Sequence, residues 1–158
     1  MNTRTIRLLL LSFLLCFTAA AAIAQSPADK IIGTYYVKDD QSPEEAKIRI
    51  YKTTNGTYAG RMVWVKNTTF KDGTPKRDIM NPDPKKRDTP ADQIQMLSHF
   101  TYDAAKNAWV DGFIYDPVHG KTYKCKMWFG DDKTLKIRGY IGVPAFGRTM
   151  SWTKVQDK

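Results

Sequence analysis

Cysteine and histidine are scarce in this chain, which has two of each among its 158 residues. Cys16 lies in an apolar run near the N-terminus, so only Cys125 remains if that run is removed on export. A single cysteine cannot form an intramolecular disulfide, so the domain must be stabilised by packing. One cysteine and two histidines also indicate neither a zinc site nor a redox pair. We therefore expect no metal and no cofactor.

The N-terminal segment has the pattern of an export signal. Two arginines precede an apolar run at 8–17, and the small residues at 19–24 end in a small-x-small cleavage site. The run is shorter than the roughly 20 residues that cross a membrane. A lipoprotein signal, the alternative, would need a small residue before Cys16, where Leu15 stands. We interpret residues 1–24 as a cleaved signal peptide and predict a periplasmic or secreted protein without a transmembrane span in its mature chain.

The mature chain, 25–158, has the length of a single domain, and it is basic. Lysine and arginine number 25 and aspartate and glutamate 16 in the full sequence, and the two signs are interleaved. A basic exported protein meets anionic lipid headgroups, cell-wall polymers and anionic metabolites before it meets nucleic acid. A well-solvated surface without a partner has the same composition. We expect no nucleic-acid partner.

Sustained helical periodicity is also missing, and at most a helical turn is expected at 42–46 or 75–80. Short alternating segments, rich in β-branched and aromatic residues and separated by turn residues, predict strands instead. The expected strands are 32–38, 46–52, 57–65, 95–102, 108–115, 122–129, 134–141 and 148–155.

The connections between these segments predict their arrangement. Asn55-Gly56 is a strong hairpin signal, and most other connections have hairpin length. Eight sequential antiparallel strands close most naturally into an up-and-down barrel, which removes exposed edges. The connection 66–94 is the exception, and a loop of this length is usually functional or disordered. The predicted fold is an all-β, eight-stranded antiparallel barrel with one long loop between strands 3 and 4.

Strand alternation predicts what fills the barrel. Leu135 and Ile137 share one face of their strand, and Tyr58, Met62 and Trp64 share one face of theirs. The interior of an eight-stranded barrel is just wide enough to be filled by side chains or to hold one small ligand. Because many large residues compete for this space, we expect a mostly filled barrel with a small pocket at one end.

A series of motifs runs in order along nearly the whole mature chain: IGTY at 32–35, YAGR at 58–61, DIMNPD at 78–83, WVDGFIYDP at 109–117, GKTY at 120–123, RGYIGVPAFGR at 138–148, and Trp152. Together they resemble the bacterial exported family known as domain of unknown function 2147. The resemblance implies a lipocalin-like, calycin-type barrel and an exported protein. It implies no chemistry, because the family has no agreed activity.

The lipocalin-like resemblance also implies how one barrel end is closed. Lipocalins open with Gly-x-Trp, and the tryptophan packs under a basic residue from the last strand. Here Tyr35 takes the place of the tryptophan, and Lys154 is the candidate basic partner. A cation over an aromatic face contributes about 0.5 to 2 kcal/mol. We expect Tyr35 and Lys154 to serve structural closure.

No set of catalytic residues is visible. The stretch DPVHG at 116–120 puts an acid near a histidine, but its proline and glycine are typical of a type I turn. Ser98 and Ser151 lack the glycines of a nucleophile elbow. His99 stands alone in a strand, and Cys125 fits a buried apolar position. We predict that the protein is not an enzyme.

The glycine-rich connection 142–147 carries Phe146 between Arg138 and Arg148. Aromatic residues with arginines at a barrel mouth suit an amphipathic ligand with a negative group, which arginine binds in a bidentate manner. A tight barrel corner with Phe146 plugging the end is the alternative. The predicted ligand-binding residues are Trp64, Tyr115, Tyr123, Arg138, Tyr140, Phe146 and Arg148.

The stretch RDIMNPDPKKRD at 77–88 predicts an ordered cap over one barrel end. Its prolines stiffen the chain, its acidic and amide side chains can accept bonds from backbone N–H groups, and Arg77 or Arg87 can pair with them. The cap is either a structural plug or a lid that contacts ligand. A calcium site is a third reading, although the spacing matches no calcium loop. The residues expected to shape the cap are Asp78, Asn81, Asp83 and Arg87.

Two functions follow from this reading. The first is an exported, non-enzymatic barrel that binds a small amphipathic or anionic ligand at one mouth. The second is an envelope interaction module with a filled barrel, whose loops or outer face bind a protein or a cell-wall polymer. Val63 with Val65, or Val110 with Ile114, would then offer outward apolar surface. An apolar cavity of about 300 Å³ would favour the first function, and a large exposed apolar patch the second.

Overall fold

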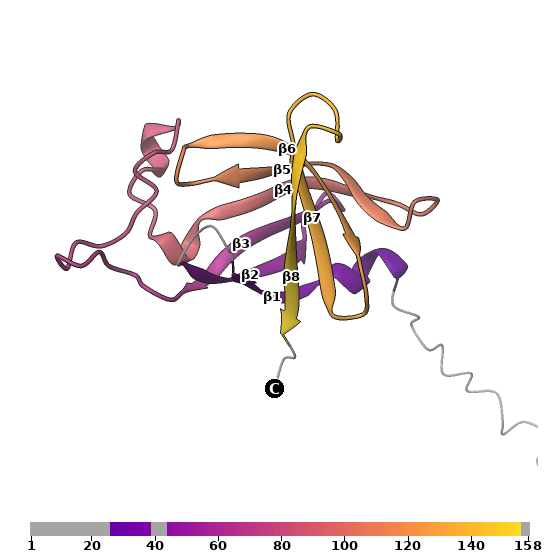
Figure 1. The fold of residues 1–158 in the computed structure, drawn as a ribbon, viewed down its shortest axis with the longest axis horizontal. Helices are drawn as coiled ribbons and strands as arrows, with labels where there is room; N and C mark the ends of the chain where they lie inside the picture. The colour runs from indigo at the N-terminus through magenta and orange to yellow at the C-terminus, as the bar shows by residue number, and fades with distance from the viewer. Residues whose placement is uncertain (1–25, 39–43, 156–158) are drawn as a thin grey trace, which may run out of the picture.

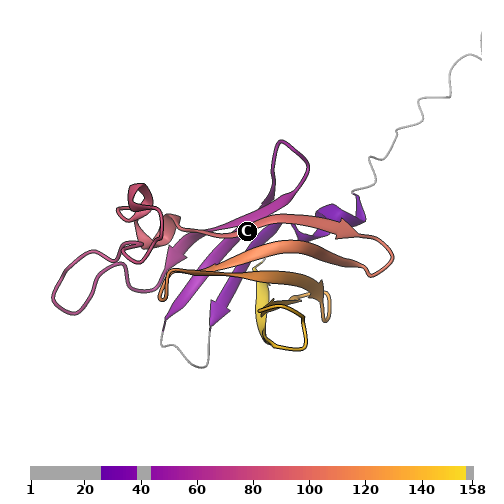
Figure 2. The same cartoon turned by 90° about the horizontal axis from the view of Figure 1, so that it is seen from above.

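A computed structural model describes residues 26–38 and 44–155, which form one closed antiparallel barrel (Figures 1 and 2). Each strand pairs with the next along the chain, and β8 returns to pair with β1. The strands are β1 (Gly33–Lys38), β2 (Glu45–Lys52), β3 (Tyr58–Val65), β4 (Gln95–Asp103), β5 (Ala108–Asp116), β6 (Lys121–Phe129), β7 (Thr134–Tyr140) and β8 (Gly147–Val155). This confirms the predicted fold, and each strand end lies within one residue of its expected position.

Helical structure in the described residues is confined to three short 3-10 turns, η1 (Pro27–Ile31), η2 (Pro84–Lys86) and η3 (Ala91–Gln93). No helix forms at 75–80: backbone bonds join Lys76 to Ala91 and Asp78 to Thr89, and a single hydrogen-bonded turn follows from Asp78 to Asn81. No described helix is long and apolar enough to cross a membrane. The proposed signal peptide lies outside the described residues. So do residues 42 and 43 of the expected turn at 42–46, whose last two residues belong to β2.

The two ends of the barrel differ. At one end, here called the closed end, η1 lies with the β2–β3, β4–β5 and β6–β7 turns. At the other, the open end, lie the β5–β6 and β7–β8 connections and the long loop 66–94. Both views place this loop beside the β5–β6 turn (Figures 1 and 2).

Large side chains fill the barrel interior. Trp109, Trp152, Tyr35 and Phe100 are fully buried, together with several aliphatic residues of the same inward faces. Gly112 provides the space for one of them, since a Cβ there would lie 2.4 Å from the Phe100 ring. The expectation of a mostly filled barrel therefore holds for the described residues.

Trp64 does not share the inward face of Tyr58 and Met62, as the sequence alternation suggested. Ile48 pairs with Met62 but its neighbour Lys47 pairs with Trp64, so β3 holds one extra residue at this point. Such a β-bulge reverses the faces that follow it. Trp64 is therefore 38% exposed on the outer surface, with the Lys47 ammonium 5.4 Å from its ring centroid.

Candidate functional site

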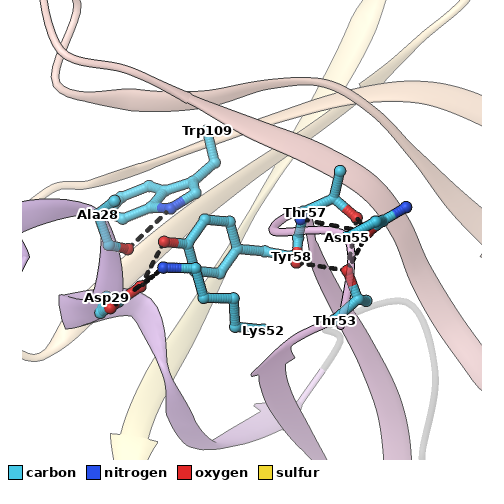
Figure 3. A network of polar contacts seen from close by, with 8 residues as sticks. All are labelled: Ala28, Asp29, Lys52, Thr53, Asn55, Thr57, Tyr58 and Trp109. Atoms are coloured by element: carbon cyan, nitrogen blue, oxygen red, sulfur yellow. Dashed lines mark hydrogen bonds and ion pairs between the residues drawn. The ribbon is translucent and has the colours of Figure 1, made fainter.

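The closed end is sealed by hydrogen bonds from the barrel to η1 (Figure 3). The Trp109 indole N–H donates to the carbonyl of Ala28 at 3.1 Å. Asp29 accepts from the Tyr58 hydroxyl and forms an ion pair with Lys52 at 2.9 Å. These two bonds, the one from tyrosine first, lower the pKa of the Asp29 carboxyl. Every contact in this network joins parts of the barrel to one another, so the network serves closure.

Tyr35 and Lys154 complete the seal. The two residues are opposite each other in the β1–β8 pairing, and the Lys154 ammonium lies 5.8 Å from the Tyr35 ring centroid. The ammonium also donates to the carbonyl of Lys30 at 2.6 Å, and the buried Tyr35 hydroxyl donates to the carbonyl of Ile31 at 2.8 Å. The arrangement implied by the lipocalin-like resemblance is thus present, with tyrosine in the tryptophan place.

The loop 66–94 is held by an internal hydrogen-bond network that begins at Asp78. Asp78 is 2% exposed, and its carboxylate accepts from the Tyr115 hydroxyl at 2.7 Å and from the Asn81 amide at 2.6 Å. The Asn81 side chain in turn accepts from the backbone of Asp83, and the Asp83 carboxylate accepts from the backbone of Lys85. The segment is therefore ordered, and β5 supplies one of its anchors.

Two details of the expected cap are corrected. The arginines do not pair with its acidic side chains: Arg77 donates to the carbonyl of Asp88 and Arg87 to that of Asn81. The Asp78 carboxylate was expected to accept from backbone N–H groups of the loop. It accepts instead from two side chains, the Tyr115 hydroxyl and the Asn81 amide. Within residues 26–38 and 44–155, no group of three or more acidic, histidine or cysteine side chains could hold a metal ion.

The anchor of the loop lies on the outer side of the barrel. Ile114 is buried and faces the core, so Tyr115 beside it points outward to Asp78. At the adjoining turn, a Cβ on Gly120 would lie 2.1 Å from the carbonyl oxygen of Met80. These contacts bind the loop against the rim of the open end.

Arg138 and Tyr140 also lie on the outer face, because they alternate with the fully buried Ile137. The Arg138 guanidinium donates to the carbonyls of Pro144 at 2.6 Å and Ala145 at 3.2 Å. Arg138 therefore braces the β7–β8 connection. Of the predicted ligand-binding residues, Trp64, Tyr115, Arg138 and Tyr140 face outward.

The inward faces at the open end carry a layer of half-buried apolar side chains over the filled core. Four residues of this kind, on four different strands, are Val37, Met62, Tyr123 and Met150. Arg148 stands one step further toward the end of β8 and shares the inward side of Met150 and Trp152. We call this layer together with Arg148 the mouth. Tyr123 and Arg148 are thus the predicted ligand-binding residues on inward faces near the open end.

The β7–β8 connection stands beside the mouth with three exposed apolar side chains. Phe146 is 77% exposed, so it does not plug the barrel as the alternative reading held. Ile141 is the last residue of the expected strand 134–141. It is 70% exposed, because β7 already ends at Tyr140. Backbone bonds between 141 and 146 and between 143 and 146 hold the connection in a compact turn.

Groups capable of acid–base or nucleophilic chemistry are not assembled in the described part of the chain. The Asp116 carboxylate contacts the His119 ring at 2.7 Å, but it also accepts from backbone N–H groups of its own turn, and the histidine is exposed. Cys125 is fully buried, and burial raises the pKa of its thiol to about 12.

Two recesses of a few hundred Å³ open on the surface of the described structure. One, of about 310 Å³, lies between β3 and η3 and is lined by Arg61, Met62, Val63, Asp92 and Gln93. The other, of about 280 Å³, lies on the outer face of β5 and β6 and includes Val110 and Trp128. Ile114 belongs to the core, so the outward apolar pair of Val110 and Ile114 is corrected.

The sequence reading did not single out Val37 and Met150 as mouth residues. The signal was present, since Val37 follows Tyr35 and Met150 precedes Trp152 at strand spacing. The sequence pattern does not show the height of each residue, that is, how far along the barrel axis it lies. Height depends on the register of all eight strands, which single-strand alternation leaves open.

An eight-stranded, up-and-down antiparallel barrel with a 3-10 turn at one end defines a lipocalin-like barrel. Residues 33–154 match the family described as an uncharacterised protein conserved in bacteria (DUF2147), and the chain belongs to this family.

Among solved structures, HP1028 from Helicobacter pylori, which is described as a member of the lipocalin family, is similar with a TM-score of 0.65. The match has 21% sequence identity and covers 80% of this chain and 83% of that one, so it supports the fold alone. No curated protein matches the chain.

Proposed function

We propose that this protein is an exported, non-enzymatic binding protein whose mouth takes a small amphipathic ligand with an anionic group. The observation that carries the proposal is the layer of half-buried apolar side chains at the open end, with Arg148 directly beyond it. Apolar surface that is partly open to solvent can gain burial when a ligand covers it. An arginine at its edge suits a carboxylate, sulfate or phosphate.

The filled core limits the depth of binding. Below the mouth the interior is occupied by fully buried residues such as Ile137, Leu97 and Trp152. A ligand therefore lies on the layer and does not enter the barrel. Covering about 150 Å² of apolar surface contributes about 4 kcal/mol, and a charge-assisted bond to arginine about 1.5 to 3 kcal/mol. Because association has its own entropic cost, we expect a modest affinity, in the micromolar to millimolar range.

The neighbouring residues have supporting roles. Arg138 holds the β7–β8 connection, whose exposed Phe146 lies at the side of the mouth and can extend its apolar surface. Asp78, Asn81 and Asp83 order the loop 66–94 through bonds within the protein, so they shape the rim without contacting ligand.

A direct test uses 8-anilinonaphthalene-1-sulfonate, an amphipathic anion that fluoresces in apolar sites. Titration of the mature protein is compared with the variants Arg148→Gln and Met150→Gln. We expect both to weaken binding at least fivefold, the first through the sulfonate and the second through the apolar layer. Lys133→Gln, a charge change at the opposite end, is the matched control and is expected to leave binding unchanged. Binding by Arg148→Gln and Met150→Gln equal to that of the unmodified protein would refute the mouth as the site.

Two further variants separate direct contact from support. Arg138→Gln is expected to weaken binding less than Arg148→Gln, because Arg138 acts through the carbonyls of residues 144 and 145. Asp83→Asn is expected to have no effect, since its side chain only caps the backbone at Lys85. An equal loss of binding in Arg148→Gln, Arg138→Gln and Asp83→Asn would indicate general damage to the open end.

A further inference from the structure

The outer face of β6 and β7 carries cations and aromatic rings in adjacent rows. We call this surface the basic wall, and it consists of Lys124, Lys126, Trp128, Lys136, Arg138 and Tyr140. The β6–β7 pairing sets Lys124 opposite Tyr140, Lys126 opposite Arg138, and Trp128 opposite Lys136. All six side chains point outward, because they alternate with inward residues such as Cys125, Met127 and Ile137, which are fully buried.

The charge arrangement of the basic wall is unfavourable for folding. Like charges directly opposite each other in a sheet are destabilising, and Lys126 opposite Arg138 is such a pair. The wall's cations donate hydrogen bonds to neutral groups, with Ser151 accepting from Lys136 at 2.8 Å and Thr149 from Arg138 at 2.8 Å. The nearest acidic contribution comes from the β6–β7 turn, where backbone N–H groups and, to a smaller extent, the charge of Lys136 lower the pKa of the Asp131 carboxyl. A surface that served solubility alone would mix the two signs. The wall is therefore suited to an anion supplied from outside.

An aromatic recess adjoins these cations. The recess of about 280 Å³ on the outer face of β5 and β6 is lined by Trp128, Lys126, Lys106 and Val110, among others. The Lys126 ammonium lies 5.5 Å from the Trp128 ring centroid. The recess has room for one sugar ring, whose aliphatic face can pack against the indole while its polar rim stays in water.

We propose that the basic wall binds an anionic polysaccharide, with Trp128 and its recess taking a sugar ring and the cations pairing with the acidic groups of the chain. Cations two residues apart on a strand are about 7 Å apart, and directly opposite residues about 5 Å, so a linear chain of charged sugars can meet several of them at once. This surface lies on the outside of the barrel and is distinct from the mouth, so the inference goes beyond the proposed function.

The test measures binding of heparin, a sulfated polysaccharide, to the mature protein at several salt concentrations. In the triple variant Lys124→Gln, Lys126→Gln, Lys136→Gln, we expect at least tenfold weaker binding and a smaller salt dependence, because fewer counterions are displaced. The matched control Lys71→Gln, Lys85→Gln, Lys86→Gln removes the same charge from exposed positions in the loop 66–94, and we expect less than a twofold change. Equal losses in the two triple variants would overturn the proposal, since attraction would then follow net charge alone.

Two additional measurements identify the class of polymer. Trp128→Leu keeps every charge, and we expect it to weaken heparin binding at least threefold because the stacking surface is lost. Single-stranded DNA of equal charge should bind at least tenfold more weakly than heparin. If DNA binds as tightly as heparin, or if Trp128→Leu binds heparin unchanged, the assignment to a polysaccharide is wrong.

Stability provides a readout that is independent of binding. Lys126→Gln removes the like-charge pair with Arg138 and also the ammonium near the Trp128 ring. These two contributions oppose each other, so the melting temperature without heparin should change by less than about 2 °C. Heparin should raise the melting temperature of the unmodified protein but not of the wall triple variant. An equal rise with heparin in the wall triple variant would show that heparin binds elsewhere and would overturn the proposal.

Discussion

Lys154 of β8 lies directly opposite Tyr35 of β1, with its ammonium 5.8 Å from the centroid of the tyrosine ring. The same ammonium donates to the carbonyl of Lys30 at 2.6 Å. One cation thus connects the last strand, the first strand and η1. Barrel closure requires β8 to find β1 across the whole length of the chain, and Lys154 stabilises that pairing at the point where η1 covers the end.

Replacing Lys154 with methionine should destabilise the fold by about 1 to 3 kcal/mol. Methionine keeps most of the apolar contact of the lysine side chain, but it loses the cation over the ring and the charge-assisted bond to a carbonyl. The free energy of unfolding from urea titration measures the loss. Tyr35→Phe should lose about 1 kcal/mol, because it keeps the ring beneath the cation and removes only the buried bond to Ile31.

Lys133→Met is the control for this pair, since its side chain lies in an exposed turn of the closed end. A change of less than about 0.5 kcal/mol is expected there. Equal stabilities for Lys154→Met and Lys133→Met would contradict a closing role for Lys154.

Gly120 and Met80 form a contact that sequence spacing could not reveal. A Cβ at position 120 would lie 2.1 Å from the Met80 carbonyl oxygen, and the glycine has a φ of +63°. Gly120→Ala should therefore push the loop segment around Met80 away from the β5–β6 turn. The released segment contains Lys85, Lys86 and Arg87, so digestion by trypsin at these sites should become at least tenfold faster.

Gly56→Ala is a matched control for this prediction. Gly56 has a φ of +84°, and nothing lies within 4 Å of the added Cβ. The Gly56→Ala variant therefore reproduces the backbone strain, about 1 kcal/mol, without a collision of the added Cβ with another residue. If the two variants are digested equally fast in the loop, Gly120 does not hold the loop in place.

The strands could be predicted because each one satisfies a local rule. Buried and exposed residues alternate in β6 and β7 as the sequence indicated, and the connections between strands are short enough to leave few topologies. The match between Tyr35 and Lys154 could be expected from the lipocalin-like resemblance. In all these cases, the information lies within one strand or in one known pairing.

The site was less predictable because it depends on register and on contacts between distant segments. The bulge that turns Trp64 outward arises from the pairing of β2 with β3, which no single-strand pattern shows. Arg138 was expected at the mouth, yet it faces outward and binds carbonyls of its own connection. Asp78 was expected to bind loop backbone, but Tyr115, distant in sequence, donates to it.

Buried groups with raised pKa values should make the protein unstable in alkali. Burial raises the pKa of the Cys125 thiol to about 12, and it raises the pKa values of the Tyr35 and Tyr58 hydroxyls above their usual range. In the unfolded chain, a thiol loses its proton near pH 8.5 and a tyrosine near pH 10. At a pH between the unfolded-state and the folded-state pKa of such a group, the folded protein keeps the proton and the unfolded chain has lost it. The free energy of unfolding is thus fully retained below about pH 8.5 and decreases as pH rises.

The slope of this decrease identifies the groups responsible. Each group contributes a loss of about 1.4 kcal/mol per pH unit, so Cys125 should act first, between about pH 9 and 10. Tyr35, Tyr58 and the two other tyrosines with raised pKa values, Tyr36 and Tyr115, should join above pH 10. Urea titrations at half-unit steps from pH 7 to pH 11 would measure the profile. Cys125→Ala leaves a small cavity and so lowers stability at every pH, but its profile should be flat between about pH 9 and 10. A slope in that interval equal to that of the unmodified protein would show that the thiol is not the titrating group, because the alanine variant has no proton there to lose.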